Sequence, residues 1–259
     1  MNEASRFQAE SEPAAEAKPT SIKPDLDELR AHPIFDGLNR NIADCLLSAS
    51  TALQYRAGSF IVHQGGRLDG LHVVHRGLVD LAHVNGDHEC GVMLLSTKDL
   101  LLPASALFGE PSIVSARALT TTKVVVFGAA EVSAAMEVSR VLANNILKAM
   151  SGHWRMTVRN VLDLNCRTAA QRLAAFLLRL VDLQPDCGAP ILPIAKRHLA
   201  ARLGMTAETL SRMLQVVADN GVHVRGRTII VNDRARAEAF CGPDPYPGGD
   251  ERGLNVFAL

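Results

Sequence analysis

The stretch RHLAARLGMTAETLSRMLQVVADNGVHVRGRTIIV, residues 197–231, decides the fold of the C-terminal part of the chain. Its pattern predicts two helices, at 195–203 and 206–219, that are broken at Gly204. A pair of strands that turns at Gly226 follows them. Two short helices and a hairpin in this order predict a winged helix-turn-helix.

The residue types within this stretch suit a close helix crossing. Ala200 and Ala201 are small enough to let two helices approach, Gly204 lets the chain turn, and Thr206 can cap the second helix. The residues expected to form the shared core recur at helical spacing and are Leu199, Leu203, Leu210, Leu214 and Val217.

In such a motif the second helix enters the major groove of DNA. Glu208, Ser211 and Arg212 are spaced i, i+3 and i+4, so they share one face of that helix. Arg212 can donate two hydrogen bonds to guanine, Glu208 can accept one from cytosine, and Ser211 can touch a neighbouring base. We interpret these three residues as base-reading. The alternative is that Glu208 and Arg212 form an ion pair on a solvated helix.

Basic residues gather in the same region, although the formal net charge of the whole chain is zero. Residues 193–241 hold eight Lys and Arg against four acids, while residues 1–30 hold seven acids against four bases. A local basic surface binds phosphate without reading sequence. The predicted contacts to the DNA backbone are Arg197, Thr206, Arg225 and Arg227.

Between Leu53 and Phe127 short β-type segments alternate with glycine-marked turns. Asn85-Gly86, between VDLAHV and HECGVML, indicates a hairpin, because both residues tolerate positive φ. Many short strands with closely spaced turns are typical of a double-sheet roll. The expected fold class is therefore α+β, with a jelly-roll sensor domain, a long dimerisation helix and a C-terminal winged helix-turn-helix domain.

A long helix is predicted from about Glu131 to Asn165, where glycine nearly vanishes. Its apolar residues form two neighbouring stripes, one of which contains Leu142, Ile146 and Ala149. Two stripes fit a helix that packs on its own domain and on a second copy of the chain; the alternative is one wide stripe in a single-chain core. The predicted dimer-interface residues are Leu147, Met150, Trp154, Thr157, Val161 and Leu164.

The composition excludes several classes of protein. No apolar run approaches the roughly 18 residues of a membrane helix, and the acidic N-terminus lacks the apolar region of a secretory signal. The five cysteines are dispersed without C-x-x-C spacing. No G-x-S-x-G, P-loop, H-E-x-x-H or Rossmann pattern is found. We expect a reduced, cytoplasmic protein that is not an enzyme and has no membrane partner.

The expected organisation has five parts. Residues 1–25, rich in Ala, Glu, Ser and Pro, are predicted to be a disordered extension. The sensor domain follows at 26–135, the dimerisation helix at 136–166 and the DNA-binding domain at 167–241. Residues 242–259 are predicted to be a flexible tail.

These features resemble the CRP/FNR family of bacterial transcription regulators, over roughly residues 29–241. The stretches YRAGSFIVHQG (55–65) and LHVVHRGLVDL (71–81) are similar to the family's roll, a cyclic-nucleotide-binding-like double-stranded β-helix. HLAARLGMTAETLSR (198–212) is most similar to the FNR, FixK and DNR/NnrR branches, which share the E-x-x-S-R pattern. Ala207 stands where the cyclic-AMP receptor branch typically has an additional Arg.

The resemblance implies a homodimer on the palindrome TTGAT-N4-ATCAA. It also implies an activator that works with RNA polymerase and responds to a gas, redox or other signal. The family's cyclic-nucleotide cassette resembles G-E-L-S-L-L-x-G-E-P-R-S-A, and LPASALFGEPSIV (102–114) aligns with it. Pro103, Ser112 and Ile113 replace the ribose glutamate, the phosphate arginine and its hydroxyl partner. The usual binding of cyclic AMP is therefore not expected.

Other effectors follow from the remaining cysteines and histidines. No cysteine precedes Cys45, which argues against an iron–sulfur cluster of the FNR type. Haem stays open as a cofactor, with His88 and Cys90 as candidate ligands because they alternate onto one strand face. A regulator that responds to cyclic nucleotides through an atypical cassette is the other alternative.

Overall fold

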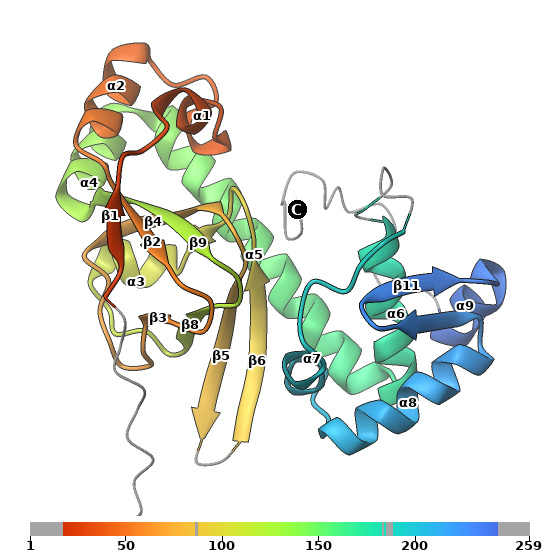
Figure 1. Ribbon diagram of the computed structural model, residues 1–259. Helices are drawn as coiled ribbons and strands as arrows, with labels where there is room; N and C mark the ends of the chain where they lie inside the picture. Colours follow the sequence, from red (N-terminus) through yellow and green to blue (C-terminus); the bar gives the residue numbers. More distant parts are fainter. Residues whose placement is uncertain (1–17, 86–87, 183, 185–188, 243–259) are drawn as a thin grey trace, which may run out of the picture.

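The computed structural model describes residues 18–85, 88–182, 184 and 189–242 of the 259-residue chain. The N-terminal half is a β-roll flanked by helices, and a single long helix joins it to a smaller C-terminal domain (Figure 1). Residues 243–259 of the predicted tail (242–259) and residues 1–17 of the predicted extension lie outside the described residues.

The roll is built from nine strands among the described residues, arranged in two antiparallel sheets. One sheet has the order β1-β2-β9-β4-β7 and the other the order β3-β8-β5-β6. The strands are β1 (Thr20–Ile22), β2 (Thr51–Tyr55), β3 (Phe60–Val62), β4 (Gly70–Arg76), β5 (Val79–Asn85), β6 (His88–Leu95), β7 (Leu100–Leu101), β8 (Ser115–Ala118) and β9 (Thr122–Gly128). Strands β5 and β6 pair as the hairpin that Asn85-Gly86 predicts, with Asn85 opposite His88.

Helices cover the roll and lead out of it. They are α1 (Leu26–Arg30), the 3-10 helix η2 (Pro33–Phe35), α2 (Arg40–Ser48), α3 (Pro103–Phe108), α4 (Ala129–Val138) and α5 (Arg140–Cys166). Asn39 caps the start of α2, where its side chain accepts a hydrogen bond from the Asn41 amide.

The C-terminal domain, which we call the reader, has the predicted winged helix-turn-helix order. It contains α6 (Ala169–Asp182), α7 (Lys196–Arg202), α8 (Ala207–Asp219), β10 (Val222–Arg225), β11 (Thr228–Val231) and α9 (Arg234–Cys241). The fold class expected from the sequence is confirmed.

The structure differs from the predicted boundaries at three places. Residues 20–22, assigned to the disordered extension, form the edge strand β1 because they pair with β2. Residues 117–127, one of the β-type segments expected between Leu53 and Phe127, contribute to two strands, since the chain passes from one sheet to the other between β8 and β9. The long helix begins at Arg140, because Ser139 is extended and its hydroxyl caps the Leu142 amide.

The interior of the roll is filled with aliphatic side chains. Val74, Val79, Leu95 and Leu101 are at most 1% exposed and belong to one buried cluster. A second cluster joins the roll to α5 through Leu142 and Ile146, which are likewise buried. No helix in the described part of the chain combines the length and apolarity needed to cross a membrane.

Candidate DNA interface

The turn between α7 and α8 is formed as the residue types predict. Gly204 has φ +62°, a conformation that favours glycine, and the Met205 amide donates to the Ala200 carbonyl at 3.0 Å. The Thr206 hydroxyl accepts a hydrogen bond from the Thr209 amide at 3.1 Å and so caps α8. The helix that would enter DNA therefore starts at a defined point.

The three predicted base-reading residues lie exposed in the first turns of α8. The Ser211 hydroxyl donates to the Ala207 carbonyl at 3.1 Å, and the Arg212 guanidinium donates to the Thr209 hydroxyl at 3.4 Å. Among the described residues Glu208 has no ion pair with Arg212. The base-reading role of the three residues stays a prediction.

The four predicted backbone contacts have different environments. Thr206 acts as the cap of α8, and Arg225 is exposed at the end of β10. Arg197 donates from Nε to the His198 ring at 3.1 Å. Arg227 donates to the Leu192 and Pro193 carbonyls, each at 3.0 Å, so it braces the wing against the segment before α7.

Two of these arginines line a cleft between the reader and the roll. The cleft has a volume of about 420 Å³. Its cations are Lys196, Arg197 and Arg227, and its other wall includes Leu119 and Thr120 of the roll. Three of the eight basic residues counted in residues 193–241 therefore lie together beside the start of α7.

The long helix α5 carries an exposed apolar stripe. Leu147, Trp154, Val161 and Leu164 are 63%, 69%, 50% and 46% exposed, and the first three are seven residues apart. The other two predicted interface residues, Met150 and Thr157, are half-buried. Because Leu142 and Ile146 are buried against the roll, the two stripes that the sequence predicts lie on different faces.

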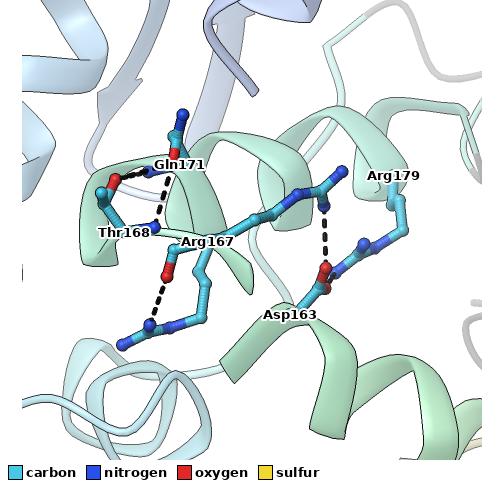
Figure 2. Close-up of polar contacts among 6 residues, drawn as sticks. Asp163, Arg167, Thr168, Gln171 and Arg179 are labelled. Atoms are coloured by element: carbon cyan, nitrogen blue, oxygen red, sulfur yellow. Dashed lines mark hydrogen bonds and ion pairs between the residues drawn. The ribbon is translucent and has the colours of Figure 1, made fainter. Parts of the chain in front are cut away.

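A polar network that the sequence reasoning missed fixes the joint between α5 and α6. Buried Asp163 accepts from Arg167 at one carboxylate oxygen and from Arg179 at the other, both at 2.8 Å (Figure 2). Thr168 and Gln171 cap each other's backbone amides in the same view, at 3.3 and 3.0 Å. The i, i+4 spacing of Asp163 and Arg167 was the available signal.

In the stretch that aligns with the cyclic-nucleotide cassette, Pro103 and Ser112 are buried and pack or form hydrogen bonds within the roll. Pro103 is buried in the first turn of α3. The Ser112 hydroxyl donates to the Val114 carbonyl at 2.6 Å, and the Ser112 carbonyl accepts from the Gly65 amide at 2.7 Å. Ile113 is 79% exposed. This stretch carries no cation at the positions that would hold a phosphate.

The candidate haem ligands lie at the tip of the β5–β6 hairpin. Cys90 is exposed, and the His88 side chain lies outside the described residues. Among the described residues there is no group of three or more His, Cys, Asp or Glu that could hold a metal ion. Buried His72 is bound to the Gly70 carbonyl at 2.7 Å, and burial lowers its pKa. Ligation by His88 and Cys90 stays a prediction.

A winged helix-turn-helix joined by a long helix to a β-roll defines a class of DNA-binding regulators with a separate sensor domain. Residues 171–240 match the family of Crp-like helix-turn-helix domains, and residues 52–139 match the family of cyclic nucleotide-binding domains. These two matches, in this order along the chain, agree with the resemblance to the CRP/FNR family of transcription regulators. Regulators of this family bind DNA and are dimeric.

Known proteins are similar to the chain over most of its length. The chain is 28% identical to a cyclic AMP receptor protein from Thermus thermophilus, over 75% of this chain and 89% of that protein. Its fold is similar to FixK2 from Bradyrhizobium japonicum, with a TM-score of 0.67, 23% identity and coverage of 75% and 98% of the two chains. A CooA variant from Carboxydothermus hydrogenoformans has a TM-score of 0.66 at 15% identity, with coverage of 86% and 98%.

Proposed function

We propose that this regulator reads an FNR-like palindrome, TTGAT-N4-ATCAA, with Glu208, Ser211 and Arg212 of α8. The observation that carries the proposal is that all three side chains are exposed on the first turns of a capped helix. Arg212 has a planar donor pair suited to guanine, and Glu208 can accept from the paired cytosine. Ala207 lacks the arginine that would favour the site of the cyclic-AMP receptor branch.

The experiment is an electrophoretic shift with this duplex and with a scrambled duplex of the same composition. Both are titrated at physiological salt, because non-specific binding is strongly salt-dependent. We expect clear preference for the palindrome. Equal affinity for the two duplexes would refute the proposed specificity.

Homodimerisation is part of the proposal, because a palindrome presents two equal half-sites. The exposed stripe of Leu147, Trp154, Val161 and Leu164 on α5 supports it, since this heptad-like seam leaves large apolar side chains in water in a single chain. We further propose that the dimer activates transcription with RNA polymerase as its partner, as the family resemblance implies.

The signal that we propose is a gas, a redox change or another effector that is not a cyclic nucleotide. The support is that Ser112, in place of the phosphate-binding arginine, is buried and bonded to its own loop. The second candidate is a cyclic-nucleotide-responsive regulator with an atypical cassette, which the match to cyclic nucleotide-binding domains favours. Calorimetry with cyclic AMP and cyclic GMP separates the two, and micromolar binding of either nucleotide would support the second.

Haem is the cofactor that we propose to test first. Protein purified without oxygen would show a Soret band if haem is bound. Replacing His88 and Cys90 separately with Ala should then shift or remove the band. A spectrum without a Soret band would argue against haem.

A further inference from the structure

The roll and the reader meet where strand β6 crosses helix α7, as Figure 1 shows. A methyl group added at Gly91 of β6 would lie 2.9 Å from the Arg202 Cα atom and 3.1 Å from its amide nitrogen. Such separations are shorter than side-chain carbons tolerate, so only glycine lets β6 approach the α7 backbone this closely. Gly91 thus lies at the close contact between β6 and α7, which we call the junction of the two domains.

The apolar core is continuous across this junction. Leu78 and Leu94 of the roll are 2% and 0% exposed, and they belong to the same buried cluster as Leu199 and Leu203 of the reader. Asn160 of α5 also donates to the Val92 carbonyl at 3.0 Å, which fastens β6 to the long helix. The reader is therefore packed against the roll rather than only tethered to it.

A buried acid of the roll lies near two basic side chains of the reader. The Asp80 carboxylate on β5 lies 3.7 Å from Nδ1 of His198, and both side chains are almost completely buried. Burial lowers the pKa of Arg202 to about 10, and the negative charge of Asp80 opposes that shift. The Arg202 guanidinium also lies over the Phe176 ring, at 5.8 Å from its centroid.

Asp80 is therefore shared between the two domains. Within the roll it stands opposite Arg117 of the neighbouring strand β8. Towards the reader it lies beside the His198 ring, and its negative charge opposes the lowering of the Arg202 pKa. Both reader residues, His198 and Arg202, belong to α7, the first helix of the DNA-binding motif.

We infer that Asp80 is a positioning residue for DNA reading, through which the roll sets the orientation of α7 and hence of α8. The inference rests on the proposed function, because orientation matters only if α8 reads bases. Helix α7 carries Lys196 and Arg197 and is bonded through the turn to α8. A change in the roll that moves β5 or β6 is transmitted to the DNA-reading face by this contact.

The test uses the full-length chain and compares Asp80→Asn with Asp80→Glu and with Asp182→Asn. Asp182 is the matched control, since it pairs with Arg234 on the exposed side of the reader, away from the junction. Hydrogen–deuterium exchange follows the amides of α7 and of the roll, and gel shifts follow the palindromic and scrambled duplexes.

For Asp80→Asn we expect faster exchange in α7 with unchanged exchange in the strands of the roll. We also expect affinity for the palindrome to fall about 5–30-fold, the range that corresponds to one or two kcal/mol. Affinity for the scrambled duplex should stay the same. Asp80→Glu, which keeps the charge, should recover most of the lost affinity.

Two results would overturn the inference. One is that Asp80→Asn behaves like Asp182→Asn in both measurements; the other is that exchange rises throughout the roll, which indicates a purely structural role. A second variant, Gly91→Val, should push β6 away from α7 and give the same pattern as Asp80→Asn. If the wild-type chain binds both duplexes equally, the proposed function fails, whereas the exchange data still decide whether Asp80 holds α7.

Discussion

The reader and the roll differ in where their predicted functional residues lie: exposed on a helix in the reader, and buried within the fold in the roll. In the reader, Glu208, Ser211 and Arg212 lie exposed on a helix whose cap and turn are set locally. In the roll, Pro103 and Ser112 align with ligand-binding residues of the cassette that the sequence resembles, and both are buried within the local fold. On a surface helix, the spacing of residues in the sequence predicts which side chains share the exposed face. Inside a sensor domain, the environment of a side chain can be described only when the arrangement of the surrounding strands is known.

The largest effect that we predict comes from the long helix between the two regions. Trp154→Glu places a charge in the exposed apolar stripe, so the chain should become monomeric in sedimentation velocity. Affinity for the palindrome should fall about 100-fold or more, because a monomer loses the second half-site.

The control for this variant is Val138→Glu, which adds the same charge at an exposed apolar position of α4, outside the stripe. It should leave the oligomeric state unchanged. A Trp154→Glu chain that stays dimeric would show that the exposed stripe of α5 is not the dimer interface.

The reader's side of the comparison is tested by Arg212→Ala. Loss of a bidentate contact to guanine should weaken the free energy of binding to the palindrome by about 1–3 kcal/mol and leave binding to the scrambled duplex almost unchanged. Arg236→Ala removes the same charge from an exposed position of α9 and serves as the control. Equal losses from both variants on both duplexes would mean that Arg212 contributes only charge.

For the roll, the prediction concerns how burial of a titratable side chain makes its stability depend on pH. His32 is buried, with its ring bonded to the Ile34 amide and the Lys98 carbonyl, and burial lowers its pKa to about 4 from 6.5. A group with a depressed pKa binds protons mainly in the unfolded state between pH 6.5 and 4. Its contribution is complete above pH 6.5 and is lost as the pH falls towards 4.

We therefore expect the free energy of unfolding to drop by about 2 kcal/mol from this group between pH 7 and pH 5. Urea unfolding at both pH values measures it. The variant His32→Gln, which retains a donor and an acceptor but does not titrate, should show a smaller drop. The same drop in both proteins would place the acid sensitivity elsewhere, for instance at His72, whose pKa burial also lowers.

The smallest predicted effect separates two arginines of the wing. Arg225→Ala should weaken binding to every duplex by a similar few-fold factor and reduce the salt slope by about 1. Arg227→Ala should in addition lower stability by about 1 kcal/mol, since its two hydrogen bonds brace Leu192 and Pro193. Thermal unfolding compares the two variants, and equal stability would refute the bracing role.

Much of the fold follows from local pattern. The helix break at Gly204, the wing turn at Gly226, the hairpin at Asn85 and the two stripes of α5 all depend on residues close in sequence. The exact bounds of the helices and strands were harder to predict from the sequence. Residues 20–22 are too few to predict a strand by themselves, and they form β1 because they pair with the edge of β2.

The sequence by itself determined the class of this protein and the face of α8 that would read DNA, because cap, turn and helical spacing are local properties. Only the tertiary structure decided how the parts are joined. It brings Asp163 between Arg167 and Arg179, gives Arg227 a bracing role, and sets Asp80 and Gly91 of the roll against α7. Several of these contacts join residues far apart along the chain. Their formation depends on which buried charges and backbones the packed domains bring together, which no local pattern records.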